Sequence, residues 1–193
     1  YNDMQDLILP YIDVNSLEVD SAGHFVVPVT FRNLAAAWSK GIEFEGAWSP
    51  VEWIIPFFNI TFQKSEDMHY NVPLDYVPSV KASFGFDLSK TFGNYSLDIH
   101  FDEGVVGKRS YLNWQTPSIK DVRIIYDGPE PEVIPPEREL DEYFRTDVKV
   151  RCEYKARMWG EFSALNLFNA EFEEAGGTIA PARLVYLGIG FRI

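Results

Sequence analysis

Cysteine is nearly absent from this chain of 193 residues. Cys152 is the only one, so an internal disulfide is excluded. The chain also lacks any uninterrupted apolar run of about 18 residues, which excludes a transmembrane helix. A transmembrane β-strand needs only about 9–11 residues of alternating character. The missing helix therefore leaves membrane insertion through strands open.

Basic residues are also scarce. The chain has 17 Lys and Arg residues against 29 Asp and Glu residues, and its net charge of −12 argues against nucleic acid as a partner. The same balance argues against a polycationic channel for anions. An initiator Met and a signal peptide are missing, and Tyr1 opens directly on a strand-like stretch. We therefore expect a mature protein that is incomplete at its N-terminus.

Signatures of catalysis are missing as well. The chain contains no G-x-S-x-G nucleophile elbow and no Gly-rich phosphate loop, so we predict that it is not an enzyme and that it uses no cofactor or metal ion. Two acidic sets invite a catalytic or metal-binding interpretation: Glu43 with Glu45, and Asp98 and Asp102 with His100. Polar residues at alternate strand positions explain both sets more simply, as residues lining the lumen of a barrel.

Two further candidates are also better explained without chemistry. Cys152 alternates with apolar residues, whereas a nucleophilic thiol needs a polar, partly exposed setting, so we expect a small lipid-facing residue. The acidic run at residues 171–174 lacks the ligand order of a calcium loop, so we expect a solvated loop tip.

Apolar residues alternate with other residues up to the end of the chain. Successive strand side chains point to opposite faces, so residues 183–193 form a strand with one apolar face. That face carries Val185, Leu187, Ile189, Phe191 and Ile193. Lipid is the simplest cover for such a face, and the pattern predicts the closing strand of an outer-membrane β-barrel.

The same period of two recurs along the chain. It is found at residues 41–48, 58–63, 79–88, 95–102 and 147–154. Residues 1–11 and 160–169, together with the C-terminal strand, bring the number to about eight strands, and no stretch has a convincing helical period. We therefore predict an all-β, antiparallel, up-and-down transmembrane barrel fold.

The predicted connections alternate strictly in length. Short ones at residues 48–52, 90–94 and 155–158 alternate with long ones at residues 12–30, 64–73, 109–142 and 170–182. Transmembrane barrels have short periplasmic turns and long extracellular loops, which places the C-terminus in the periplasm. Residues 109–142 are acidic and rich in proline, so we expect a solvated, mobile loop there, with residues 121–126 able to extend a strand above the membrane.

Aromatic residues are abundant, at 16% of the chain. Several of them lie beside the predicted short turns: Trp48, Trp53, Tyr95, Tyr154 and Trp159. Amphipathic rings favour the headgroup zone of a membrane, so we predict an interface belt at this end of the strands.

Four short motifs resemble those of TonB-dependent outer-membrane receptors. Asn33, Gly41 and Glu43 stand where that family has its "N-x-G/A…G-x-E-x-E" strand, and Pro78 stands where it has "vP". The family's "N-L-F-[DN]" and "P-x-R" motifs are matched by Asn166, Leu167, Phe168, Asn169, Pro181 and Arg183. The resemblance covers nearly the whole chain. It departs at the last residue, which is usually aromatic in the family and is Ile193 here.

The resemblance implies a function for a larger protein. Residues 1–193 would be about eight C-terminal strands of a barrel of about 22, without its plug domain, TonB box and earlier strands. The whole receptor would import a scarce solute, such as a ferric siderophore, cobalamin or an oligosaccharide. Its partners would be outer-membrane lipid, that solute ligand, the TonB complex through the missing part, and the barrel-assembly machinery, which would recognise the C-terminal apolar row.

Two other hypotheses stay open. A complete small barrel of about eight strands, with a structural or adhesion role, requires residues 1–11 to pair with residues 183–193. A soluble secreted β-sandwich or carbohydrate-binding module requires a second layer over the apolar face. The deciding feature is the environment of Phe84, Ile99, Val150 and Ile189, which the membrane hypothesis leaves uncovered by protein.

Overall fold

The structure is a computed structural model that describes residues 2–12, 18–19, 25–26, 29–68, 70–113, 123–125 and 132–192. The chain divides into two compact units. Unit 1 comprises Tyr1–Lys40, Lys64–Val77 and Arg109–Leu140, and unit 2 comprises Gly41–Gln63, Pro78–Lys108 and Asp141–Ile193. Among the described residues, no helix has the length and apolar character needed to cross a membrane.

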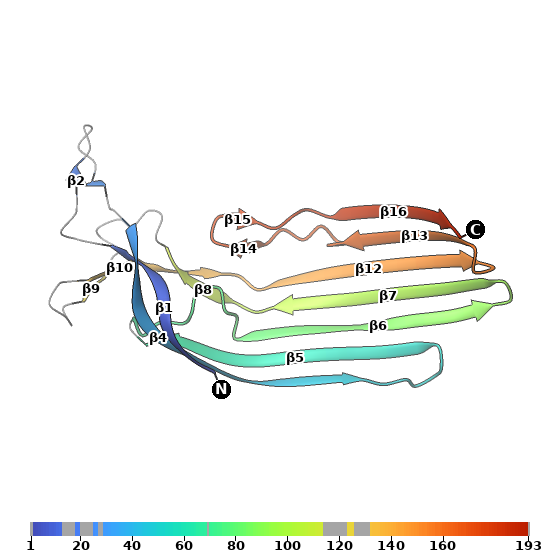
Figure 1. Ribbon diagram of the computed structural model, residues 1–193, viewed down its shortest axis with the longest axis horizontal. Helices are drawn as coiled ribbons and strands as arrows, with labels where there is room; N and C mark the ends of the chain where they lie inside the picture. The colour runs from blue at the N-terminus through green and yellow to red at the C-terminus, as the bar shows by residue number, and fades with distance from the viewer. Residues whose placement is uncertain are drawn as a thin grey trace. The chain divides into compact units, whose positions relative to one another are not determined.

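Unit 2 is built on one antiparallel sheet in which strands that follow one another in the chain lie side by side (Figure 1). Its strands are β4 (Val29–Ala47) from Gly41 on, β5 (Ile54–Asp67) up to Gln63, β6 (Val80–Phe92), β7 (Tyr95–Val106), β12 (Tyr143–Tyr154), β13 (Met158–Leu165) and β16 (Leu184–Phe191). With β1 (Asn2–Ile12), the strand order is β1-β4-β5-β6-β7-β12-β13-β16. The predicted all-β, up-and-down antiparallel fold is confirmed.

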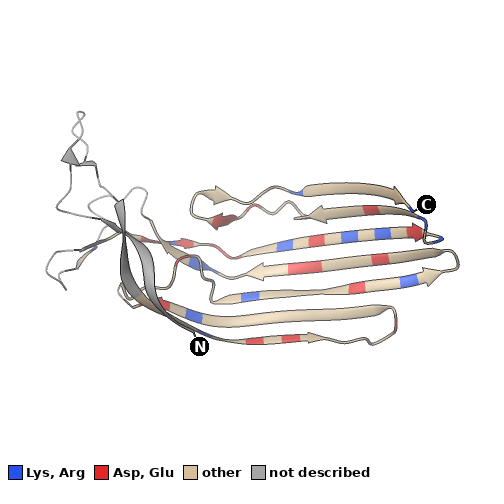
Figure 2. Cartoon of the chain, viewed as in Figure 1, with Lys and Arg blue, Asp and Glu red and all other residues tan. Residues whose placement is uncertain are grey.

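The register carries the alternation seen in the sequence from β6 across to β16. One row joins directly opposed apolar residues from β6 to β16: Leu88, Ile99, Val150, Phe162 and Leu187. The next row is polar over most of its length: Ser89, Asp98, Arg151, Glu161 and Gly188. Opposed residues share a face, so the sheet has one apolar face and one polar face. Figure 2 shows charged residues recurring along β12 between uncharged ones.

No second layer covers the apolar face within the described part of unit 2. Ile189 is 83% exposed, Leu187 82% and Phe84 49%. The buried residues described in this unit are Thr146, Ala164, Asn166 and Ala180, none of them a large apolar residue. A soluble sandwich would bury this face against another sheet, and the structure has no such packing here.

The connections of unit 2 differ in length at the two ends of its strands. Short turns follow β4, β6 and β12, at the end of the sheet where the C-terminus lies (Figure 1). Left-handed backbone closes two of them, at Gly93 with φ of 60° and at Lys155 and Ala156 with φ of 52° and 53°. The long connection before β16 carries a small hairpin of β14 (Glu173–Ala175) and β15 (Thr178–Ile179). The predicted positions of the three short turns are confirmed, and the acidic run ends in this hairpin.

Unit 1 has a small apolar core of its own. Tyr70, Val72, Leu112 and Ile134 form one buried cluster. Four short strands accompany the pairing of β1 with β4: β8 (Arg109–Leu112) with β11 (Glu137–Leu140), and β9 (Arg123–Ile125) with β10 (Glu132–Ile134). A further pair joins β2 (Glu18–Val19) to β3 (Phe25–Val26).

The expectation of a solvated loop at residues 109–142 holds for only part of the described segment: residues 137–139, 141 and 142 are exposed, but other residues are buried. Ile134 is 1% exposed, and Pro135 and Leu140 are buried as well. Pro135 and Pro136 do interrupt the ladder, but they do so between β10 and β11, where the chain changes partner. Residues 123–125 of the predicted strand at 121–126 form β9, which pairs with β10, and its extension of a strand above the membrane stays a prediction. Residues 114–122 and 126–131 lie outside the described residues.

Candidate functional site

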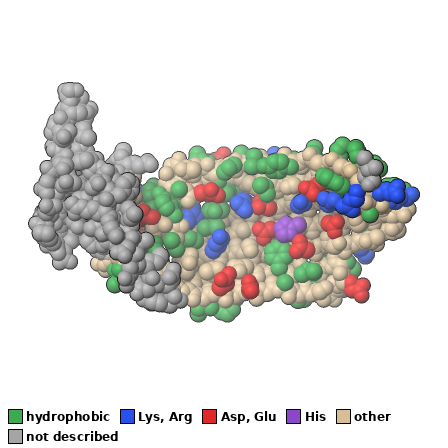
Figure 3. Space-filling model, viewed as in Figure 1, with side chains coloured by type: hydrophobic (Ala, Val, Ile, Leu, Met, Phe, Trp, Pro, Cys, Tyr) green, Lys and Arg blue, Asp and Glu red, His purple; other side chains and the backbone are tan. Residues whose placement is uncertain are grey.

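The polar face of unit 2 gathers its charged side chains over β6, β7, β12 and β13 (Figure 3). Alternation puts them on one side of the sheet, and the antiparallel register brings them level with one another. We call the set the polar-face cluster, and its members are Asp87, Ser89, Asp98, His100, Lys149, Arg151, Glu153 and Glu161.

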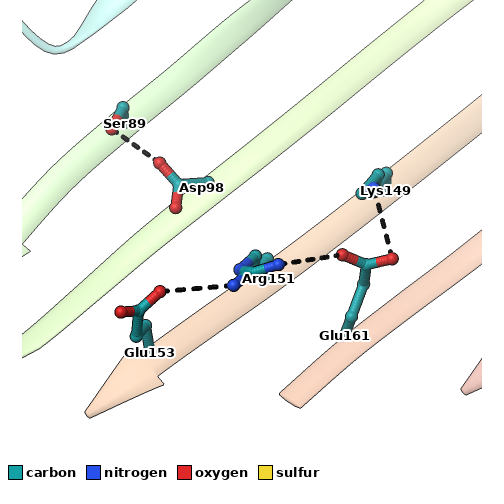
Figure 4. Close-up of polar contacts among 6 residues, drawn as sticks. All are labelled: Ser89, Asp98, Lys149, Arg151, Glu153 and Glu161. Carbon is teal, nitrogen blue, oxygen red and sulfur yellow. Dashed lines mark hydrogen bonds and ion pairs between the residues drawn. The ribbon is translucent and has the colours of Figure 1, made fainter. Parts of the chain in front are cut away.

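Arg151 is the centre of the ion pairs in this cluster (Figure 4). Its guanidinium lies 3.4 Å from Glu153 Oε2 and 3.7 Å from Glu161 Oε2, and Lys149 Nζ lies 3.2 Å from Glu161 Oε1. The guanidinium also lies 4.6 Å from the centre of the Trp159 ring. These side chains are partly exposed, and such pairs each contribute at most about 1 kcal/mol. The network therefore balances charge on this face more than it stabilises the fold.

Asp98 and His100 are engaged by different partners. Asp98 Oδ1 accepts a hydrogen bond of 2.6 Å from the Ser89 hydroxyl, whereas His100 Nδ1 lies 2.7 Å from Asp87 Oδ1. The His100 ring also stacks on Phe57, with the ring centres 5.7 Å apart. In the described ranges, no group of three His, Cys, Asp or Glu residues is arranged to hold a metal ion.

Glu43 and Glu45 lie on β4, both exposed. The side-chain amide of Asn59 donates a hydrogen bond of 2.7 Å to Glu43 Oε1, which occupies one of the two carboxylates with a neighbouring strand. Gly41 precedes them where a side chain has no room, since an added Cβ would lie 3.0 Å from Gln63 Cβ. This part of the motif thus shapes the contact between β4 and β5.

The N-L-F-N and P-x-R motifs meet in one hydrogen-bonded knot between β13 and β16. Asn166, only 4% exposed, donates from its backbone N–H to Asp147 Oδ1 at 2.9 Å and from its side chain to the Ala170 carbonyl at 2.9 Å and the Pro181 carbonyl at 3.4 Å. Its Oδ1 accepts from the Ala170 N–H at 2.8 Å.

Asn169 and Arg183 complete the knot. Asn169 Oδ1 accepts a hydrogen bond from the Arg183 N–H at 2.9 Å, and the Arg183 guanidinium donates to the Leu167 carbonyl at 3.3 Å. Both asparagines have left-handed backbone, with φ of 53° for Asn166 and 55° for Asn169, a conformation that Asn tolerates better than most residues. Phe168 is exposed beside them.

The remaining motif positions are not brought together. Asn33 lies in β4 within unit 1, and its side chain is outside the described part of the structure. The Pro78 carbonyl accepts a hydrogen bond of 2.9 Å from the Gln63 side chain, just before β6. In the C-terminal row, Val185, Leu187, Ile189 and Phe191 are exposed, and Ile193 lies outside the described residues.

The aromatic residues near the short turns occupy both faces. Tyr95 and Tyr154 are directly opposed on the apolar face, with their rings 4.9 Å apart. Trp159 pairs with Glu153 on the polar face instead, and its ring lies across Gly188 and Gly190, where an added Cβ would collide with it. Trp159 therefore does not belong to a belt on the apolar face.

Glu103 is a residue that the sequence pattern missed. It lies on the apolar face between Phe84 and Thr146, and the Thr146 hydroxyl donates a hydrogen bond to its carboxylate. The sequence could have indicated this position, because Glu103 lies two residues after Phe101 and two before Val105, and a period of two places all three on one face.

Comparison with known proteins finds similarity at the level of structure. No protein-family model matches the chain, and no curated protein matches it. The solved structures that match include the ferripyoverdine receptor of the outer membrane of Pseudomonas aeruginosa bound to ferripyoverdine, with a TM-score of 0.61. They also include P. aeruginosa FpvA bound to a heterologous pyoverdine with iron, at 0.60, and the FpvAI–pyocin S2 complex, at 0.60.

Each match is 13% identical and covers 95% of this chain and 23% of the other chain. The chain thus spans less than a quarter of the length of these structures. Similarity at this level of identity establishes the fold and leaves the activity open. The chain has the fold of one part of these outer-membrane receptors.

Proposed function

We propose that residues 1–193 form part of the transmembrane barrel of an outer-membrane receptor that imports a scarce solute with energy delivered by TonB. The chain supplies barrel wall, lumen lining and extracellular loops. Its apolar face meets lipid, its polar face lines the lumen, the short turns and C-terminus face the periplasm, and the long connections face outward.

The observation that carries this proposal is the uncovered apolar face of a single-layer sheet. Ile189, Leu187 and Phe84 stay exposed while the opposite face pairs its charges among Lys149, Arg151 and Glu161. Water is a poor solvent for such an apolar face, and hydrocarbon is a good one. The complete small barrel is not favoured, because β1 and β16 stand at opposite ends of the strand order.

The solute belongs to the class that includes ferric siderophores, cobalamin and oligosaccharides. Two of the matched structures hold a ferripyoverdine or a pyoverdine–iron complex, which favours a ferric siderophore. The plug domain and TonB box lie outside this chain in the proposal, so the TonB complex acts through them. The hydrogen bonds of the knot at Asn166 and Arg183 hold the chain just before β16 in place. The barrel-assembly machinery recognises the apolar row of β16.

Transport by cells tests the proposal. The gene is deleted, and uptake of a radiolabelled ferric siderophore, cobalamin and an oligosaccharide is measured with TonB intact or inactivated. We expect loss of one of the three activities on deletion, its return when the gene is restored, and no return in cells without TonB. Unchanged uptake of all three, or uptake that survives the loss of TonB, would overturn the proposal.

A further inference from the structure

An open apolar groove lies at the short-turn end of the apolar face. It has a volume of about 330 Å³ and is lined by residues of β7, β12, β13 and β16, including Tyr95, Cys152, Tyr154, Met158, Gly160 and Ile189. Such a volume is at the lower end of the range for small-molecule sites. All six residues belong to unit 2.

The groove exists because Gly160, which has no side chain, lies in a row of residues on the apolar face. Cys152, Gly160 and Ile189 are opposed across three strands, with Gly160 in the middle. An added Cβ at Gly160 would meet no atom within 4 Å, so the space above the backbone is open. The next row towards the turns runs through Tyr95, Tyr154, Met158 and Phe191 and forms the rim. A flexible apolar chain fits this shape.

Basic residues stand at the same end of the sheet. Lys155 and Arg157 form the turn after β12, and the Arg192 N–H donates a hydrogen bond of 2.7 Å to the Arg157 carbonyl. All three residues are exposed, and no ion pair recorded among the described residues includes any of them. Figure 3, which looks onto the polar face, shows Lys and Arg side chains gathered at this end of the sheet, on a chain whose net charge is −12; the groove lies on the opposite face.

We infer that this groove and the basic turn next to it bind one anionic phospholipid, with an acyl chain over Gly160 and the phosphate among Lys155, Arg157 and Arg192. The inference depends on the proposed membrane location of the sheet. Apolar contact alone would select no headgroup, whereas basic residues near a membrane surface favour anionic lipids. Aromatic rings at the rim suit the boundary between headgroup and hydrocarbon.

Native mass spectrometry of the purified protein, as its gene encodes it, tests the inference. The protein in neutral detergent is titrated with phosphatidylglycerol or with phosphatidylcholine. We expect one phosphatidylglycerol to be retained in preference to phosphatidylcholine. Arg157→Gln and Arg192→Gln should each weaken phosphatidylglycerol binding about fivefold, and Gly160→Leu should abolish the selective site by filling the groove.

Two matched variants control for charge and bulk. Lys81→Gln removes an exposed cation from the polar face, and Ala82→Leu adds the same kind of bulk to the apolar face away from the groove. Both should bind phosphatidylglycerol like the wild type. Equal retention of the two lipids, or equal weakening in the controls, would overturn the inference. Recovery of the protein from outer membranes is scored separately, so that failure of the membrane proposal is told apart from failure of the lipid site.

Discussion

At the residue scale, the face of the sheet decides which substitution the protein tolerates. Ile99 lies on the apolar face between Leu88 and Val150. A lysine there would place a charge in hydrocarbon at a cost of about 2–4 kcal/mol near the membrane midplane. We therefore expect Ile99→Lys to reduce strongly the amount of folded protein recovered from outer membranes. Ser83→Lys, on the polar face of β6, is the control and should be recovered normally. Equal recovery of the two variants would contradict the lipid assignment.

The side chain of Asn166 makes three hydrogen bonds that hold the connection between β13 and β16. Asn166→Ala loses the bonds to Ala170 and Pro181 and keeps a left-handed backbone that alanine disfavours. We expect a loss of about 2–4 kcal/mol in the free energy of unfolding. Asn166→Gly should lose less, because glycine accepts the backbone, and Phe168→Ala should change little, because its side chain is exposed. Denaturant unfolding in detergent measures all three, and equal stabilities would refute the role of the knot.

At the scale of elements, unit 1 contains a pH-sensitive contact. Asp75 lies in the connection between β5 and β6, and its Oδ1 accepts a hydrogen bond of 2.9 Å from the Leu112 N–H in β8. Partial removal of its carboxyl group from water raises the pKa of Asp75 from 3.8 to about 6. The hydrogen bond from Leu112 opposes this shift, and the charges of Asp67 and Glu137 add to it. The folded state thus favours the protonated acid.

The sign of the effect follows from linkage. Because the folded pKa is the higher one, the contribution of Asp75 to stability is greatest below about pH 4 and is lost as the pH rises through about 6. We expect the free energy of unfolding, measured with denaturant in detergent, to fall as the pH rises from about 4 to about 6. Asp75→Asn keeps an acceptor and removes the charge, so this part of the fall should be missing in the variant. Identical pH curves for the two proteins would refute the raised pKa.

The strands of unit 2 were predictable, whereas among the small strands described in unit 1 only β9 was indicated by the sequence. Period two marks β6, β7 and β12 because each has a polar and an apolar face. β8 pairs with β11 across 24 intervening residues, a connection that leaves no local pattern in the sequence. The burial of Ile134 depends on contacts with Tyr70 and Val72, which lie far away in the chain. The period of a sequence reports only the environment of neighbouring residues. The small strands of unit 1 form through contacts with residues that are far away in the chain.

The candidate site divides in the same way. Alternation placed Asp98, His100 and Arg151 on one face, but it could not show that Ser89, Asp87 and Glu161 would be their respective partners. Those partners come from the register between strands. The family resemblance singled out Asn166 and Arg183 as separate motifs, and only the structure joins them through Asn169 and Leu167.

At the scale of the whole molecule, the apolar face of unit 2 sets the conditions in which the protein is stable in solution. Large contiguous apolar patches on soluble monomers rarely exceed a few hundred Å², and here exposed apolar residues continue from Phe58 on β5 to Ile189 on β16. We expect the protein to aggregate in detergent-free buffer and to sediment as a single species in detergent. A soluble sandwich predicts the opposite, because its apolar residues would lie between two sheets. Sedimentation velocity in both conditions distinguishes the two. A monodisperse detergent-free monomer would contradict the membrane assignment, whatever the transport assay gives.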